Sequence, residues 1–414
     1  MPSDSPLLDR FCRYVRIDTT ANDASGTYPS SPGQWDLARL LVKELQEMGA
    51  SDVEITEYAI VFATIPATIK NASPTIAFVA HMDTSPDCSG ASVQPTIHRH
   101  YQGGDIPLKG DPTKVIRVAD CPELNDVIGK TLITTDGTTL LGADDKAGVA
   151  VIMSAAAHLL AHPEIPHGPI RLCFTCDEEI GHGVDHVDPV KLGAVAAYTL
   201  DGAKPGEYEA ETFSADKATV TFKGIVIHPA LAKDRMVNAV KLAAEFLELL
   251  PKDRFSPETT SERESFVHPH LIQGGVSEVS ICFLLRSFNT AELAEQAAYL
   301  RSLAAQVVAR HPRAAVDVVV EKQYRNMADG MSKEPRVVPY LEEALRRSGL
   351  TPKKLSIRGG TDGSRLTEIG VPTPNLFTSE HNIHSPLEWA CLEEMEQAVQ
   401  VLVELSQVWA LSKC

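Results

Sequence analysis

Five strand-like segments of this chain end in histidine, aspartate or glutamate, and this pattern constrains the fold more than any other feature. Short, unbroken apolar runs are typical of strands that are buried on both faces of a sheet. Because ligands bind beyond the carboxyl ends of parallel strands, we expect the polar residues at these ends to share one crevice. The five ends carry His81 and Asp83, Asp144 and Asp145, Glu178 and Glu179, Asp201, and His384.

Helical segments alternate with the predicted strands. Residues 34–49 repeat leucine and methionine at helical spacing and end at a glycine, and residues 145–162 form an Ala- and Val-rich helix before a proline. This alternation predicts an α/β fold with a mixed, largely parallel sheet flanked by helices.

The pattern changes between residues 212 and 324. Predicted strands at 218–227, 279–288 and 316–320 alternate there with predicted helices at 236–250 and 291–310. A chain of 414 residues is long enough for two hydrophobic cores. We therefore predict a larger domain, formed by residues 1–211 and 325–414, and a smaller α+β domain inserted as residues 212–324.

Charge and composition exclude several classes of partner. The net charge of −17 argues against binding to nucleic acid or to an anionic membrane, and no apolar run approaches the ~20 residues of a membrane span. The eight cysteines are scattered, and the first six residues lack the pattern of a signal peptide. These features predict a cytoplasmic protein with reduced thiols.

The residue types at the strand ends indicate a metal centre. Taken alone, Asp144 and Asp145 would be interpreted as a solvated turn residue and a helix N-cap. Several such ends together supply imidazole and carboxylate donors without thiolate, which suits zinc, cobalt or manganese. Their number allows two ions about 3.5–4 Å apart with a shared carboxylate. Of the adjacent Glu178 and Glu179, one can bind a metal while the other takes a proton from a water molecule.

These residues resemble those of the dinuclear zinc aminopeptidases and carboxypeptidases, a family that includes desuccinylases, aminoacylases and dipeptidases. Within the family the chain is most similar to the tripeptide aminopeptidases. The motifs that carry the resemblance extend over nearly the whole chain: HMDTSPDCSG at 81–90, GGDI at 103–106, TLITTDG at 131–137, LLGADDKAG at 140–148, IPHG at 165–168, DEEIG at 177–181, MVNA at 236–239 and RGGTDG at 358–363.

The resemblance implies a role for each strand-end residue. The implied zinc ligands form two sets that share one bridging residue: His81, Asp144 and Asp201, and Asp144, Glu179 and His384. Asp83 would support His81, and Glu178 would be the general base and acid for a water activated by two zinc ions, with cobalt or manganese as alternatives. The peptide bond after Asp144 would be cis.

The resemblance also implies a zinc-peptidase catalytic domain with a ferredoxin-like lid, which matches the predicted insertion. The implied substrate-binding residues are His228, Asn238, Arg286 and Arg358. The expected activity is removal of the N-terminal residue from tripeptides. A dipeptidase, an N-acyl amino acid hydrolase and a catalytically inactive metal- or peptide-binding protein are the alternatives. The expected partner is a small peptide, and both a monomer and a homodimer fit.

The chain departs from the family pattern at several positions without losing a ligand. Cys176 stands where proline is usual, and Ala203 replaces a glycine. Ser379-Glu380-His381 replaces a Gly-Gly-aromatic run, and Ser385-Pro386-Leu387 follows His384 in place of Gly-Lys-His. His381 competes with His384 as a ligand, and the alignment favours His384.

Overall fold

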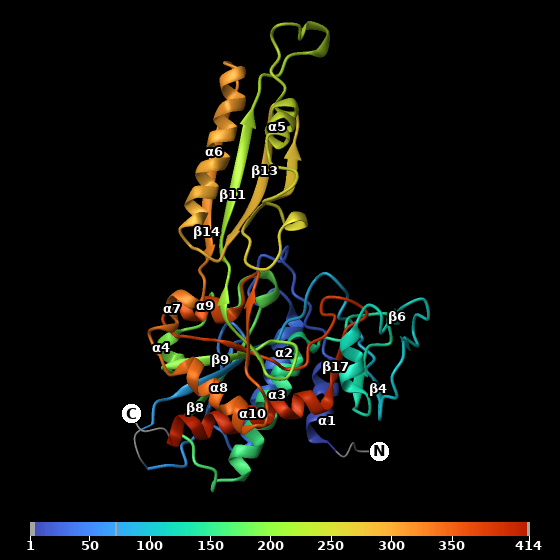
Figure 1. Ribbon diagram of the computed structural model, residues 1–414, viewed down its shortest axis with the longest axis vertical. Helices are drawn as coiled ribbons and strands as arrows, with labels where there is room; N and C mark the ends of the chain where they lie inside the picture. Colours follow the sequence, from blue (N-terminus) through green and yellow to red (C-terminus); the bar gives the residue numbers. More distant parts are fainter. Residues whose placement is uncertain (1–4, 71–72, 412–414) are drawn as a thin grey trace. The chain divides into compact units, whose positions relative to one another are not determined.

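The computed structural model describes residues 5–70 and 73–411 (Figure 1). The chain forms two compact units. Unit 1 comprises Met1–Ala210, Gly330–Leu355 and Thr361–Cys414, and unit 2 comprises Glu211–Asp329 and Ser356–Gly360. Unit 2 thus contains the segment expected as an insertion and, in addition, a short segment from later in the chain.

An eight-stranded sheet forms the centre of unit 1. Its strands, in spatial order, are β1 (Ser51–Ile55), β2 (Val61–Ile65), β8 (Ile170–Thr175), β3 (Ile76–His81), β9 (Ala196–Leu200), β16 (Asn375–Leu376), β10 (Glu207–Thr212) and β15 (Lys353–Ile357). The four neighbours β8, β3, β9 and β16 run parallel, whereas β2 and β10 pair with this group in the antiparallel sense. The predicted mixed sheet with a parallel centre is confirmed.

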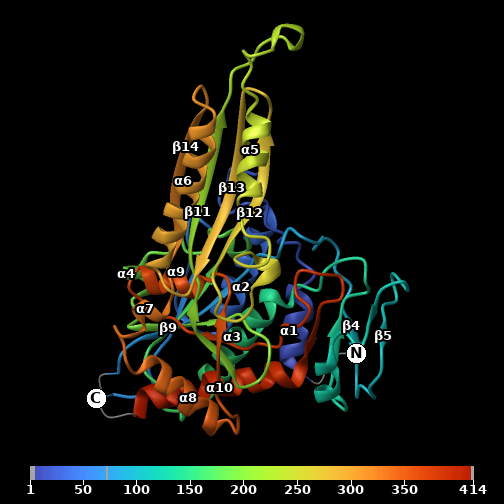
Figure 2. The same ribbon diagram turned by 45° about the horizontal axis from the view of Figure 1, so that its top comes forward.

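Helices cover both faces of this sheet, which explains why its central strands are apolar throughout. Ile76, Phe78 and Ala80 of β3 face the larger core cluster, and Ala77 and Val79 face a second one. Helices that contribute to the larger cluster are α1 (Pro6–Tyr14), α2 (Pro32–Met48), α3 (Ala143–Ala161), α8 (Val337–Arg347) and α10 (Leu392–Leu411) (Figure 2). Those of the second cluster are α4 (Pro189–Leu192) and α9 (Asp362–Glu368).

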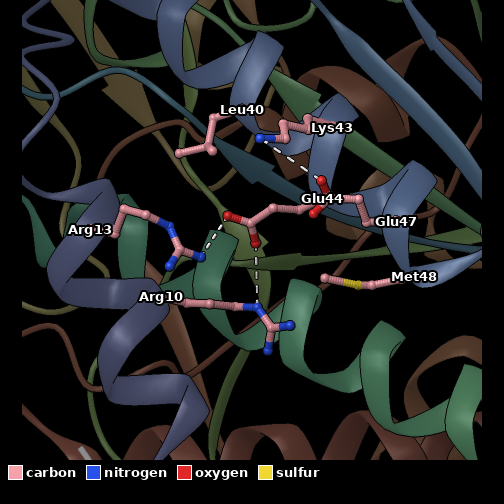
Figure 3. Close-up of a pocket in the computed structure, with 7 residues that line it drawn as sticks. All are labelled: Arg10, Arg13, Leu40, Lys43, Glu44, Glu47 and Met48. Carbon is pink, nitrogen blue, oxygen red and sulfur yellow. Dashed lines mark hydrogen bonds and ion pairs between the residues drawn. The ribbon is translucent and has the colours of Figure 1, made fainter. Parts of the chain in front are cut away.

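A buried carboxylate links α1 to α2. Glu44 points between two arginines of α1 (Figure 3): Arg13 Nη2 donates to its Oε1 at 2.6 Å, and Arg10 Nε lies 3.5 Å from its Oε2. Tyr14 Oη also donates to Oε2, at 2.8 Å. The pocket of about 450 Å³ beside these groups is lined by none of the predicted site residues.

The apolar character of residues 131–141 predicts a strand before Asp144, but most of this strand is absent, so this part of the prediction is wrong. Only β7 (Leu132–Thr134) forms, and it belongs to a separate three-stranded sheet with β17 (Trp389–Cys391) and β4 (Thr96–His98). Polar side chains of the next residues bind their own backbone; Asp136 Oδ1, for example, accepts from Thr138 N at 2.9 Å. Such local hydrogen bonds compete with strand pairing.

Short elements also occupy residues 85–130, which the sequence suggests are irregular. Besides β4, they are β5 (Ile106–Pro107), β6 (Val115–Ile116) and the 3-10 helix Pro122–Val127. Their side chains form a small core with Trp389 and Cys391 of β17.

Unit 2 has the order β-α-β-β-α-β. Its antiparallel sheet, in spatial order, consists of β12 (Phe266–Gly274), β13 (Glu278–Ser287), β11 (Ser214–Lys223) and β14 (Ala315–Tyr324). Helices α5 (Ala239–Glu248) and α6 (Glu292–Arg310) pack on the sheet and on one another. The predicted ferredoxin-like fold is confirmed, but the sequence does not predict β12. This edge strand exposes most of its second half, so it lacks an apolar pattern.

Within residues 5–70 and 73–411, no helix is long and apolar enough to cross a membrane. The seven cysteines in this part of the chain are free, as the sequence predicts. Cys414 and the first four residues, on which the predictions about thiols and a signal peptide also depend, lie outside the described residues.

Candidate metal centre and active site

Parallel pairing places three of the predicted strand ends at one edge of the sheet. β3 pairs with β9 through Val79 and Thr199, so His81 at the end of β3 lies near Asp201, which follows β9. The distance from His81 Nε2 to Asp201 Oδ1 is 4.0 Å. On the other side His81 pairs with Thr175, the last residue of β8, and this brings the 178–179 turn to the same edge.

Asp144 reaches the same place from the first turn of α3. Its Oδ1 lies 2.9 Å from His81 Nε2, and its Oδ2 lies 3.2 Å from His384 Nε2. The Nε2 atom of His384 is also 2.9 Å from Glu179 Oε2. Asp144 therefore lies between two imidazole rings, with one carboxylate oxygen toward each.

The donor atoms of the five predicted metal ligands form two groups, and within each group they lie within 4.8 Å of one another. The groups share one residue, and their members are His81, Asp144 and Asp201, and Asp144, Glu179 and His384. The side chain of Glu179 is only 5% exposed, and its Oε1 has no hydrogen-bond partner in the part of the chain that the structure describes. Burying such an oxygen is costly unless it binds a cation or a donor. The donor set therefore fits divalent cations.

The carboxyl groups of this cluster are buried close together, and a positive charge nearby would stabilise their ionised forms. Burial and the charge of Asp144 raise the pKa of Glu179 to about 7, and burial raises the pKa of Asp201 well above its ordinary value. Burial lowers the pKa of His81, but hydrogen bonds to Asp144 and Asp83 outweigh this effect and raise it. Because nearby positive charge favours ionised carboxylates, bound cations would relieve this cost.

Asp83 connects the metal ligands to the predicted base. Its fully buried carboxylate accepts from the backbone N–H of Glu178 at 3.1 Å and from that of Glu179 at 3.0 Å. One of its oxygens also lies 3.4 Å from His81 Nδ1. One side chain thus fixes a histidine ring and the turn that carries both glutamates.

Glu178 begins the 3-10 turn Glu178–Ile180 at the end of β8. Burial raises the pKa of its carboxyl group well above the ordinary value. The charges of Asp362 and Glu179 also raise this pKa, whereas the charge of His81 lowers it. A carboxyl group with a raised pKa beside the candidate ligands holds a proton more readily than an exposed glutamate, which suits a group that accepts and returns a proton.

Asp145 binds the backbone of the first turn of α3, as expected of a helix-capping side chain. Its Oδ1 accepts from Gly148 N at 3.1 Å, and its Oδ2 accepts from His81 N at 2.9 Å. The Asp144–Asp145 peptide bond is cis, which confirms the implication of the resemblance.

The sequence does not single out Glu388, yet this residue holds the turn that presents Asp144. Its buried carboxylate accepts from the N–H groups of Leu141 at 2.7 Å, Gly142 at 2.8 Å and Asp144 at 3.1 Å. No local signal could have identified this residue, because the turn lies more than 240 positions away in the chain.

The second candidate histidine, His381, has a different environment. Its ring stacks on Trp389, with centroids 3.8 Å apart, and its Nε2 lies 3.0 Å from Glu394 Oε2. His381 belongs to neither donor group, whereas His384 belongs to one of them.

Known proteins resemble this chain over most of its length. Residues 136–407 match the model of the peptidase family M20/M25/M40. A protein named Peptidase T from Exiguobacterium sp. is 43% identical over 404 residues, which cover 98% of each chain. Another Peptidase T, from Desulfitobacterium hafniense, is 45% identical over 406 residues, again covering 98% of each chain.

The chain belongs to peptidase family M20/M25/M40. Membership makes it a metallopeptidase and confirms the family predicted from the motifs. The crystal structure of aminopeptidase PepT from Bacillus cereus is similar to this M20/M25/M40 chain, with a TM-score of 0.76 and 25% identity over 98% of each chain.

The four predicted substrate-binding residues of this M20/M25/M40 peptidase all belong to unit 2 but do not lie together. Arg286 pairs with Ala215 near the start of β11, and Arg358 lies over Phe266, which pairs with Arg286. Both guanidinium groups are engaged: Arg286 Nη1 donates to Gln323 Oε1 at 3.0 Å, and Arg358 Nη1 donates to Glu262 O at 2.8 Å.

The other two residues follow the far end of β11. His228 and Asn238 belong to the segment between β11 and α5, which Figure 1 shows at the end of the sheet away from the start of β11. Asn238 Oδ1 accepts from Val240 N at 2.9 Å and caps α5. A ten-residue strand spans about 30 Å. One tripeptide therefore cannot contact both pairs of residues within a single copy of unit 2.

Proposed function

We propose that this peptidase removes the N-terminal residue from tripeptides, with Glu178 as general base and acid. The observation that carries this proposal is the pair of donor groups that share Asp144 beside a half-buried Glu178. The relatives named Peptidase T support an aminopeptidase that acts on small peptides.

The proposed cofactors are two zinc ions per chain, and the donor set also suits cobalt and manganese. One cation would be held by His81, Asp144 and Asp201, and the other by Asp144, Glu179 and His384. When bound, the two cations would polarise the scissile carbonyl and lower the pKa of the attacking water toward about 7.

The residues of the chain then move and position the proton. Glu178 takes the proton from the attacking water and returns it to the leaving amine. Asp83 holds the backbone of Glu178 and Glu179 with one carboxylate, so the base and a ligand keep a fixed spacing. Glu388 fixes the turn before Asp144 and thereby the carboxylate that the two donor groups share.

For substrate binding, we propose that Arg286 and Arg358 bind the peptide backbone or its carboxylate through their paired donors. Because His228 and Asn238 lie at the other end of the lid sheet, their proposed role in the same step requires a second copy of the chain. A homodimer is therefore the form that we propose for catalysis. Sedimentation at assay concentrations would detect the homodimer, and a monomer with full activity would contradict this proposal.

The proposed substrate class is tested by a peptide series on zinc-loaded protein. The series contains a dipeptide, a tripeptide and a tetrapeptide with a common N-terminal residue, the N-acetylated tripeptide, and N-acyl amino acids. We expect the free tripeptide to have the highest kcat/KM and the acetylated one to be inert, because an aminopeptidase requires a free amine. Faster hydrolysis of the dipeptide or of an acyl amino acid would favour those alternatives. In the same assay, Arg286→Ala and Arg358→Ala should raise KM.

A further inference from the structure

The segment that leads into α2 contacts the two residues that precede Glu178. Tyr28 Oη donates to Cys176 O at 2.9 Å. Ser30 N donates to one carboxylate oxygen of Asp177 at 2.7 Å, and the Ser30 hydroxyl donates to the other. Ser30 and Asp177 are 147 positions apart in the chain and both belong to unit 1. The end of β8 is therefore held by a distant part of the same unit.

Gln34, the third residue of α2, makes a reciprocal pair of hydrogen bonds to Asp177. Its Nε2 donates to Asp177 Oδ1 at 2.6 Å, and its Oε1 accepts from Asp177 N at 3.1 Å. Both residues are buried, with Gln34 0% exposed and Asp177 1% exposed. A single side-chain amide thus binds the backbone and the carboxylate of the residue before Glu178.

The backbone of Asp177 has a left-handed conformation, with φ of 62° and ψ of 30°. Residues other than glycine seldom adopt this conformation, and it persists where the surrounding contacts impose it. The hydrogen bonds from Gln34 and Ser30 are such contacts. Because Asp177 joins β8 to the 3-10 turn, its conformation sets the direction in which the chain enters Glu178.

We propose that Gln34 is a positioning residue for the proposed base, and that it acts through Asp177 to fix the carboxyl group of Glu178. The inference rests on the role of Glu178 in the proposed function. Glu179 keeps its amide hydrogen bond to Asp83 when Gln34 is changed, and as a proposed ligand it would also be held by its cation. Loss of Gln34 should therefore affect proton transfer and leave metal binding intact.

The test replaces Gln34 by methionine, which has a similar length but cannot donate a hydrogen bond. Tripeptide turnover is measured in the wild-type and Glu178→Gln backgrounds, and bound zinc is counted by mass spectrometry. In the wild-type background we expect kcat to fall about 10- to 100-fold, as for a small displacement of a catalytic group, with KM and two bound zinc ions unchanged. In the Glu178→Gln background kcat should change less than about twofold, because residues that act as a unit have non-additive effects.

Gln46→Met is the matched control, because Gln46 is an exposed glutamine of the same helix. It should leave kcat unchanged in each background. If Gln34→Met does not fold, Ser30→Ala removes one hydroxyl donor from the same carboxylate and should show a smaller loss with the same dependence on background.

Two outcomes separate this inference from the proposed function. Equal losses of kcat in the two backgrounds, or no loss in either, would overturn the role of Gln34 and leave Glu178 as the base. Wild-type turnover by Glu178→Gln alone would overturn the proposed function together with this inference.

Discussion

At the residue scale, Asp83 determines how the site is assembled. Its carboxylate makes two hydrogen bonds to the amides of adjacent glutamates, one a proposed ligand and the other the proposed base. It also lies beside the Nδ1 atom of His81. Changes at Asp83 should therefore affect metal binding and proton transfer together.

We predict that Asp83→Ala weakens zinc binding about 10- to 100-fold, because removing a partner of a metal-binding histidine usually has an effect of this size. The two orphaned amides should also lower the free energy of unfolding by about 1–3 kcal/mol each. Calorimetric zinc titration and urea unfolding measure the two effects. Asp36→Ala, a change at an exposed residue of α2, is the control. Wild-type zinc affinity in Asp83→Ala would show that Asp83 does not support the ligands.

The residues at the centre of the site are predictable from sequence because each lies in a local motif. His81 and Asp83 follow an apolar strand, and the Asp144 pair begins an apolar helix. Glu388 and Gln34 have no such signal. Each is recognisable only through partners brought close by folding, such as the Asp144 amide for Glu388 and the Asp177 carboxylate for Gln34.

At the element scale, the close approach of α3 to β9 positions Asp144 against Asp201. A Cβ atom on Gly148 would lie 2.0 Å from Leu200 O and 2.2 Å from Asp145 Oδ1. Only glycine permits this contact between the helix and the strand that precedes Asp201. The distance between Asp144 and Asp201 thus depends on the absence of a side chain at position 148.

Gly148→Ala is predicted to lower the free energy of unfolding by about 1–3 kcal/mol, as overpacking of a tight core usually does. It should also weaken zinc binding, because the helix must move away from β9. Urea unfolding and zinc titration measure both. The matched control is Gly275→Ala, where a Cβ atom would meet open space. If both variants behave alike, the close packing of α3 does not set the geometry of the site.

Elements were predictable where burial imposes a pattern and unpredictable where it does not. The central strand β3 is buried along its whole length and is apolar in sequence. Edge strand β12 exposes most of its second half and has no such pattern. The expected strand before Asp144 is short because Asp136 and its neighbours bind their own backbone.

At the scale of the whole molecule, the sequence largely predicts which segments of the chain form each of the two units. The switch from buried parallel strands to an α+β segment marks the insertion. The sequence does not predict that Ser356–Gly360 belongs to unit 2, because this depends on long-range hydrogen bonds such as that from Phe213 N to Ile357 O. This short segment carries Arg358, so the distribution of proposed substrate-binding residues becomes clear only in the folded chain.

The tripeptidase activity of Glu178→Gln tests whether Glu178 moves the proton at a two-cation centre. The variant keeps the size of the side chain and leaves every proposed ligand in place. We predict that it retains two bound zinc ions by mass spectrometry while kcat falls about 10²- to 10⁴-fold, the usual contribution of general acid–base catalysis. Turnover near the wild-type rate with both zinc ions bound would contradict the account.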